Sequence, residues 1–309
     1  MVSADVRAAA AAWRRRSKQL RHEIANGAGT TAALSSALAV GLARRNGVTG
    51  AALMATGTAA GVLGWWYRTS LHRIERQVRS SEDAAILGAA LGTAAPLFGR
   101  WAAEGDFAGM IARELDGAQG LVVECGSGST TLVIAERLRR AGSGRLVSLE
   151  HDTLYAAATG RLLASAGLDD VARVIEAPLR SQQLEDRRVE WYDRSIVETE
   201  IDGEIDMLVV DGPPQMSAWS RWGALPVLYP FLARNFVALL DDGRTRETSL
   251  VVHAWIDQFP DLDLYWLDTV KGTWLLKRRE SSGMSGGLLR VARRINPRPA
   301  GAGRWPVHR

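Results

Sequence analysis

The chain has 309 residues, 47% of them apolar and 23% charged, which is enough for one α/β domain of roughly 200 residues with an appendage. Its 31 glycines and 10 prolines exclude collagenous and low-complexity classes, and a single cysteine, Cys125, excludes an internal disulfide and a zinc cluster. The net charge is +9 over residues 1–80, −13 over residues 81–276 and +8 over residues 277–309. Because the acidic centre repels a phosphate backbone, we expect no nucleic-acid partner.

Two uncharged stretches follow the basic N-terminal segment of residues 1–23. Residues 24–43 and 46–67 contain no charged side chain, and each is long enough to cross a bilayer as a helix, which takes about 20 residues. Small residues recur at a spacing of four, and aromatic residues end the second stretch, as is common in membrane helices. Basic residues flank both stretches, so we expect a transmembrane hairpin over residues 24–67 with the rest of the chain facing the cytoplasm. The alternative is a soluble, alanine-rich helical pair.

The centre of the chain alternates short runs of Val, Leu and Ile with helical patterns, which predicts a doubly wound, mostly parallel α/β sheet. We assign it to residues 120–280, after a helical connector and cap over residues 68–119 and before a flexible basic tail over residues 281–309. Seven strands are expected, at Leu121–Glu124, Arg145–Glu150, Ala172–Ala177, Asp206–Asp211, Phe236–Asp241, Leu262–Asp268 and Gly272–Lys277. Helices are expected at Thr130–Ala141, Leu154–Ala166, Ser217–Tyr229 and Thr245–Phe259.

A glycine-rich turn, ECGSG at residues 124–128, follows the first predicted strand. Glycines there permit a tight turn and a close approach of a ligand to the backbone, as in dinucleotide and nucleoside sites. Thr131 stands where a dinucleotide fingerprint has its third glycine, and the carboxylate of Glu124 would repel a pyrophosphate but suit the cationic methionine end of S-adenosylmethionine. Glu150 ends the second strand, where a carboxylate can accept hydrogen bonds from ribose hydroxyls. These residues favour a nucleoside cofactor, and an NAD(P)-dependent oxidoreductase is the alternative.

Residues 82–277 resemble the class I S-adenosylmethionine-dependent methyltransferases, which have a Rossmann-like fold. The matching stretches are LVVECGSGSTT at 121–131, GRLVSLEHD at 144–152, IDMLVVDGPP at 205–214, ALP at 224–226 and LLDD at 239–242. They are most similar to bacterial members that carry the same EHD and DGPP signatures. Thr130 departs from the pattern, because many relatives have a third glycine there.

The resemblance implies S-adenosylmethionine as the cofactor and assigns it a set of binding residues. The methionine part would be lined by Glu124, Gly126, Ser127 and Gly128, the ribose held by Glu150, and the adenosine flanked by His151 and Ala177, with Asp211 also at the cofactor.

Methyl transfer is an in-line displacement, so the protein must align the acceptor and, for a hydroxyl, help to remove its proton. Asp211, at the end of the central strand, is the candidate catalytic base; the alternative is a carboxylate that only caps the following turn. Asp241 and Asp242 end the neighbouring strand. By resemblance to catechol-type O-methyltransferases, these three carboxylates would hold Mg²⁺, although the second pair here is Asp-Asp rather than Asp-Asn.

The sequence thus predicts a membrane-anchored methyltransferase that acts at oxygen on a small-molecule acceptor. Trp191 and Tyr192, together with Trp219 and Trp222, are expected to form an aromatic lid over that acceptor. A non-catalytic, membrane-tethered protein that binds S-adenosylmethionine stays open as a second alternative beside the oxidoreductase.

Overall fold

The computed structural model describes most of the chain between residues 103 and 279 and short segments on either side. The described residues are 61, 64–65, 68–78, 80–81, 83–84, 103–115, 120–215, 219–279 and 293–295. The chain divides into two compact units, residues 1–78 and residues 79–309. The predicted hairpin over residues 24–67 lies outside the described residues except for 61, 64 and 65, and no helix that the structure describes is long and apolar enough to cross a bilayer.

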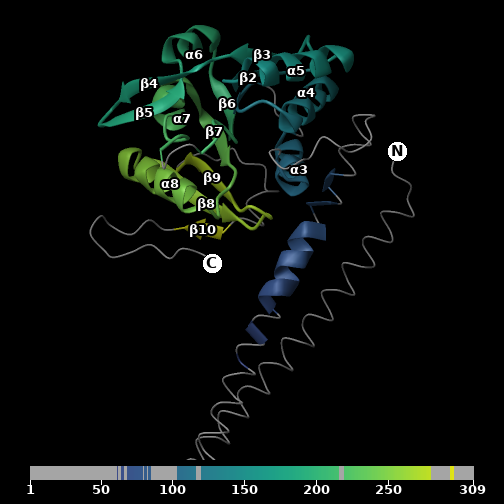
Figure 1. The fold of residues 1–309 in the computed structure, drawn as a ribbon, viewed down its shortest axis with the longest axis vertical. Helices are drawn as coiled ribbons and strands as arrows, with labels where there is room; N and C mark the ends of the chain where they lie inside the picture. Colours follow the sequence, from purple (N-terminus) through teal and green to yellow (C-terminus); the bar gives the residue numbers. More distant parts are fainter. Residues whose placement is uncertain are drawn as a thin grey trace, which may run out of the picture. The chain divides into compact units, whose positions relative to one another are not determined.

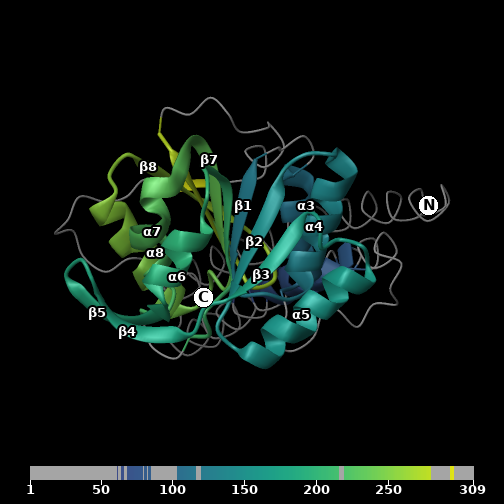
Figure 2. The same cartoon turned by 90° about the horizontal axis from the view of Figure 1, so that it is seen from above.

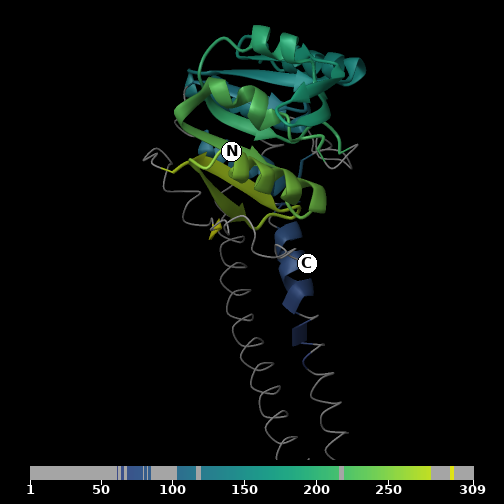
Figure 3. The same cartoon turned by 90° about the vertical axis from the view of Figure 1, so that its left-hand side faces the viewer.

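An eight-stranded sheet forms the centre of the second unit, in the order β10-β8-β9-β7-β6-β1-β2-β3 (Figure 1). Its strands are β1 (Leu121–Cys125), β2 (Arg145–Glu150), β3 (Ala172–Glu176), β6 (Ile205–Val210), β7 (Leu232–Leu240), β8 (Leu262–Leu267), β9 (Thr273–Arg278) and β10 (Arg293–Ile295). Neighbouring strands are parallel from β3 to β7, and β9, β8 and β10 pair antiparallel. The side view in Figure 3 shows the teal strands of the first half at one end of the sheet and the yellow-green strands of the second half at the other. All seven predicted strands are confirmed, and β10 is an unpredicted eighth that lies within the expected tail.

Helices cover both faces of the sheet, which confirms the doubly wound arrangement (Figure 2). On one face lie α3 (Gly105–Glu114), α4 (Ser129–Ala141) and α5 (Thr153–Ser165), and on the other lie α6 (Arg194–Glu200), α7 (Ala224–Leu228) and α8 (Arg246–Gln258). The insertion between β3 and β6 adds α6 and a two-stranded sheet of β4 (Leu179–Leu184) and β5 (Arg187–Tyr192).

Two apolar cores lie on opposite faces of the sheet because successive side chains of a strand point to opposite sides. In β1, Val122 packs in a core with Phe107 of α3 and Leu138 of α4, whereas Val123 belongs to the core that contains Trp255 of α8. Burial on both faces explains why these strands appear in the sequence as continuous apolar runs. Since α3 packs in the same core, residues that we assigned to the connector belong to the unit that holds the sheet.

The predicted helix over Ser217–Tyr229 is wrong in most of its length. Residues 219–223 form turns, and α-helix is present only from Ala224 to Leu228, followed by one 3-10 turn. A side-chain carbon at Gly223 would lie 2.6 Å from the ring of Trp191, so the chain is pressed against that ring where the turns end. Tertiary packing here overrides the helical pattern of the sequence.

The expected aromatic lid is also corrected. Trp191, Tyr192 and Trp222 are almost fully enclosed, with relative exposures of 0%, 0% and 1%, and they belong to the core on the α6–α8 face. Only Trp219 is partly exposed, and the guanidinium of Arg187 lies 4.0 Å from the centre of its ring. These aromatic residues fill space beneath the loops, where large apolar side chains contribute most to packing.

Candidate active site

The glycine turn after β1 packs backbone to backbone against the turn after β6. Gly126 has φ +94°, a left-handed conformation that favours glycine, and its N–H donates to the carbonyl of Leu149 at 2.9 Å. A side-chain carbon at Gly126 would lie 2.9 Å from the nitrogen of Gly212, so no larger residue fits. At Gly128, in contrast, such a carbon would meet no described atom within 4 Å. The loop is therefore closed on the side that faces Gly212, which we call its inner side, and open at Gly128, on its outer side.

Glu150 ends β2 beside this loop and collects hydrogen bonds from it. Its Oε2 accepts from the backbone N–H and the Oγ of Ser127, both at 3.0 Å. Its Oε1 accepts from the backbone N–H groups of His151 and Asp152, at 2.8 and 3.0 Å, and lies 2.8 Å from Nδ1 of His151. Three backbone donors thus fix the direction of the carboxylate, and two side chains occupy its remaining acceptor positions.

Glu124 lies behind the glycine turn rather than in front of it. The side chain has 0% exposure, and its oxygens accept hydrogen bonds from the hydroxyls of Thr130, Thr131 and Ser148. Burial raises the pKa of Glu124 from 4.5 to about 7, against the opposing effect of these three hydroxyls. The expected contact with a cofactor ammonium does not fit an enclosed carboxylate that is already satisfied, so this geometry favours a structural role at the start of α4.

The two residues expected beside the adenosine lie close to Glu150. His151 is half-buried, and its ring touches the Glu150 carboxylate as described above. Ala177 directly follows β3, and its N–H donates to the backbone carbonyl of Glu150 at 2.7 Å. The methyl group of Ala177 is buried in the core, so the part of this residue that stands next to the ribose position is its backbone.

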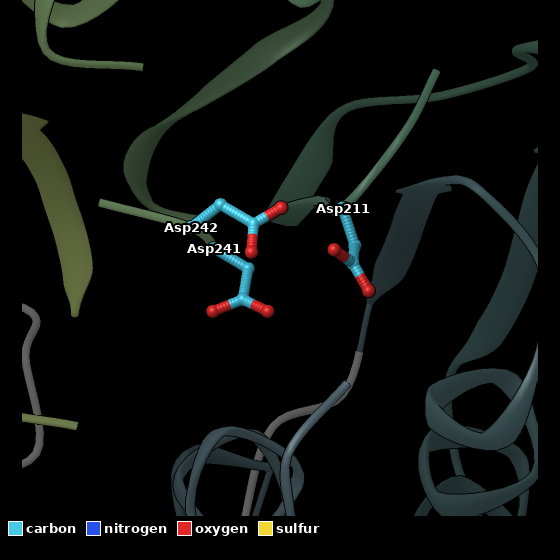
Figure 4. A group of neighbouring side chains, drawn as sticks. All are labelled: Asp211, Asp241 and Asp242. Carbon is cyan, nitrogen blue, oxygen red and sulfur yellow. The ribbon is translucent and has the colours of Figure 1, made fainter. Parts of the chain in front are cut away.

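The three predicted carboxylates meet at the ends of β6 and β7 (Figure 4). Asp211, Asp241 and Asp242, which we call the acidic cluster, offer oxygens that all lie within 4.8 Å of one another. Asp241 is buried, and neither of its carboxylate oxygens has a hydrogen-bond partner among the described residues. The structure therefore brings together the three carboxylates that the sequence analysis grouped.

Two cations that the sequence analysis missed lie in this cluster. Arg221 is 5% exposed, and its Nη2 donates to Oδ2 of Asp242 at 2.8 Å and to the carbonyl of Asp211 at 2.6 Å. Its Nη1 donates to the carbonyl of Asp241 at 3.1 Å. Lys271 places its Nζ 3.6 Å from both Oδ2 of Asp241 and Oδ1 of Asp242. Neither residue is near the aspartates in sequence, and no motif spacing points to them.

Charge and burial shift the pKa values of the cluster. Burial raises the pKa of Asp211 to about 6, although Arg221 and Lys271 act in the opposite direction. Burial, followed by repulsion from its two acidic neighbours, raises the pKa of Asp241 well above its ordinary value. Burial lowers the pKa of Lys271, but the three carboxylates outweigh it and leave that pKa raised. At neutral pH, Asp211 is therefore mostly ionised and Lys271 is charged.

The central part of the chain is similar to known proteins. Residues 123–243 match a protein family described as a methyltransferase domain, and no curated protein matches the chain. Among solved structures, the SAH-bound methyltransferase PaMTH1 from Podospora anserina has 15% identity and a TM-score of 0.46, over 68% of this chain and 88% of that one. Cofactor-bound Rv0187 from MTB has 20% identity and a TM-score of 0.46, over 65% and 91%. The SAH complex of an O-methyltransferase from Bacillus cereus has 16% identity and a TM-score of 0.44, over 64% and 88%.

Proposed function

Because residues 123–243 carry a methyltransferase domain, we propose that this chain transfers the methyl group of S-adenosylmethionine to an oxygen of a small-molecule acceptor. The family match confirms the resemblance to methyltransferases that the sequence motifs indicate. The observation that carries the proposal is the position of Glu150, whose Oε2 lies 3.0 Å from the backbone nitrogen of Ser127 in the glycine turn. A carboxylate for ribose hydroxyls thus stands directly beside a loop that is open to the rest of a nucleoside ligand.

The residues present fit this cofactor. The outer side of the loop at Gly128 is open, and the Glu150 carboxylate is held from behind by backbone N–H groups. Ribose hydroxyls would replace the two side-chain donors, Ser127 Oγ and His151 Nδ1, which can turn away without disturbing the backbone. When bound, S-adenosylmethionine supplies an electrophilic methyl group on a sulfonium centre.

Asp211 is the residue that we assign to the acceptor's proton. As a hydroxyl oxygen gains a methyl group it must lose its proton, and a carboxylate at the same strand end can take it. A pKa of about 6 leaves Asp211 mostly ionised at neutral pH, yet makes it a stronger base than an ordinary aspartate. The hydrogen bond from Arg221 to its backbone carbonyl fixes the position of this residue.

The expected Mg²⁺ is not part of this function. The acidic cluster supplies the oxygen ligands that Mg²⁺ prefers, and the unpartnered oxygens of Asp241 would be suitable ligands. However, Arg221 already takes one oxygen of Asp242, and Lys271 lies between Asp241 and Asp242. The donor set therefore fits a metal ion poorly.

The experiment that tests the cofactor site is calorimetric titration of the full-length chain, in mild detergent, with S-adenosylhomocysteine. We expect Glu150→Ala to weaken binding by about 1–3 kcal/mol, the usual cost of lost charge-assisted hydrogen bonds. Glu176→Ala is the matched control, because Glu176 ends the neighbouring strand β3 but bonds only to the hydroxyl of Thr153 among the contacts described. Equal affinity in both variants would remove Glu150 from the site, and tighter binding of NAD would support the oxidoreductase instead.

We also propose that residues 24–67 anchor the protein in the membrane with the methyltransferase domain in the cytoplasm. Support comes from the two uncharged stretches and from the basic residues on either side of them. Membranes that contain the protein should retain it after washes with high salt and with alkali. Release by salt alone would indicate adsorption through the basic ends and contradict the anchor.

A further inference from the structure

We infer that Lys271 takes the place of a metal ion in the acidic cluster, so that the cluster is complete without a divalent cation. The inference rests on the proposed function only for the statement that this cluster adjoins the acceptor. Its own basis is the position of two cations, Arg221 and Lys271, among three carboxylates.

The ammonium of Lys271 lies beside two of the oxygens that a shared metal ion would use. Its Nζ is 3.6 Å from Oδ2 of Asp241 and 3.6 Å from Oδ1 of Asp242, so it bridges two carboxylates from adjacent positions. Mg²⁺ bound by the same two oxygens would stand about 2.1 Å from each of them. An ion on these oxygens would share them with the charge of Nζ, and the two positive charges would repel each other at this partly buried site.

Arg221 engages two further oxygens of the cluster. Its guanidinium holds the second oxygen of Asp242 and lies 3.5 Å from Oδ1 of Asp211, while the carbonyls of Asp211 and Asp241 hold it in place. Two cations thus face three carboxyl groups. A divalent ion added to this set would leave an excess of positive charge. Removal of Lys271 would take one positive charge from the cluster and leave an open position.

The protein holds Lys271 in this position through its backbone. Residue 271 lies in the turn between β8 and β9, and its carbonyl accepts from the N–H of Arg244 at 2.9 Å. The preceding residue, Val270, donates its N–H to the buried carboxylate of Asp106 in α3 at 2.8 Å. The following residue, Gly272, has φ +74° and is packed against Trp266. The turn is thus fixed on both sides of the lysine, which distinguishes Lys271 from a surface lysine on a free loop.

Manganese titration followed by electron paramagnetic resonance tests this inference, because free Mn²⁺ gives a signal that disappears on binding. We expect full-length wild type to show no saturable Mn²⁺ binding at the cluster within the titrated range. Lys271→Met should bind one ion with a Kd at least about ten times below the top of that range, a gain of at least roughly 1.4 kcal/mol. Lys271→Arg retains the charge and should behave as wild type. Asp241→Asn in the Lys271→Met background should abolish the gained binding and so locate it.

Two results would overturn the inference. One is saturable Mn²⁺ binding by wild type that Asp241→Asn removes, and the other is a Lys271→Met variant that gains no binding. Titration of the same samples with S-adenosylhomocysteine separates this test from the proposed function. Wild type that fails to bind S-adenosylhomocysteine would refute the methyltransferase, whereas the Mn²⁺ result would still decide whether Lys271 excludes a metal.

Discussion

The buried carboxyl of Glu124 predicts a specific dependence of folding stability on pH. Burial raises its pKa from 4.5 to about 7, so the folded state holds this proton more tightly than the unfolded state. The stability that this group contributes is fully present below pH 4.5 and is lost as the pH rises through 7. Because one pKa unit corresponds to about 1.4 kcal/mol, the loss is on the order of 3 kcal/mol.

Glu124→Gln isolates this effect, since glutamine retains an acceptor for the surrounding hydroxyls but does not titrate. The free energy of unfolding of the variant, minus that of wild type, should increase by on the order of 3 kcal/mol between pH 4.5 and pH 8. Other titrating groups are common to the variant and wild type, so their contributions to the free energy of unfolding cancel in this difference. Glu190→Gln, at an exposed position of β5, is the control and should show no such increase.

Urea denaturation of the full-length chain, followed by tryptophan fluorescence at several pH values, measures these free energies. A difference between Glu124→Gln and wild type that is constant from pH 4.5 to pH 8 would refute the reasoning. It would mean that Glu124 titrates alike in the folded and unfolded states, and therefore that its three hydroxyl partners and its burial are wrongly placed.

Three further substitutions test the neighbouring contacts. Gly212→Ala should lower the free energy of unfolding by about 1–3 kcal/mol, because the new carbon would lie 2.7 Å from the hydroxyl oxygen of Tyr192 and 2.8 Å from Cα of Gly126. An unchanged urea midpoint would show that the turn at Gly212 does not pack against the turn at Gly126 or against Tyr192. Asp106→Ala should cost about 1–3 kcal/mol and speed amide exchange at Val270, which loses its acceptor; exchange at the wild-type rate would contradict the contact. Arg221→Lys should lower the free energy of unfolding by about 3 kcal/mol in urea denaturation, since a lysine cannot reach all the acceptors that the guanidinium holds. A loss no larger than that of a surface Arg→Lys variant would show that the forked geometry of the guanidinium is unimportant.

The seven expected strands and three of the four expected helices could be predicted because their patterns depend on local geometry. Strands buried on both faces, such as β1 and β6, appear as continuous apolar runs, and α8 shows the spacing of one buried face. The same approach failed at β4, whose residues Leu179–Leu184 are mostly polar and exposed. Its pairing with β5 depends on a neighbouring strand rather than on its own composition.

The candidate site was only half predictable for a similar reason. Glu150, Asp211 and Asp241 end strands, so an alternating α/β pattern alone places them at one edge of the sheet. Arg221 lies within the turns of residues 219–223 and Lys271 lies in a hairpin turn, and only the folded chain brings them to that edge. The glycine turn shows the opposite limit, because the sequence located Glu124 but did not indicate on which side of the turn its carboxylate lies.

The order of the last strands has a consequence for the way the protein is made. Strand β9 lies between β7 and β8, although β8 precedes it in the chain, so β8 pairs only with β9 and β10. A nascent chain that has reached residue 267 contains all three carboxylates of the acidic cluster but not the lysine that compensates them, and its β8 has no neighbour. The hairpin turn and β9, residues 268–278, therefore supply both a neighbour for β8 and the lysine of the acidic cluster. A chain that stops short of this segment should be more sensitive to proteases, since an unpaired strand and an acidic cluster with only Arg221 to compensate it both oppose closure of the fold.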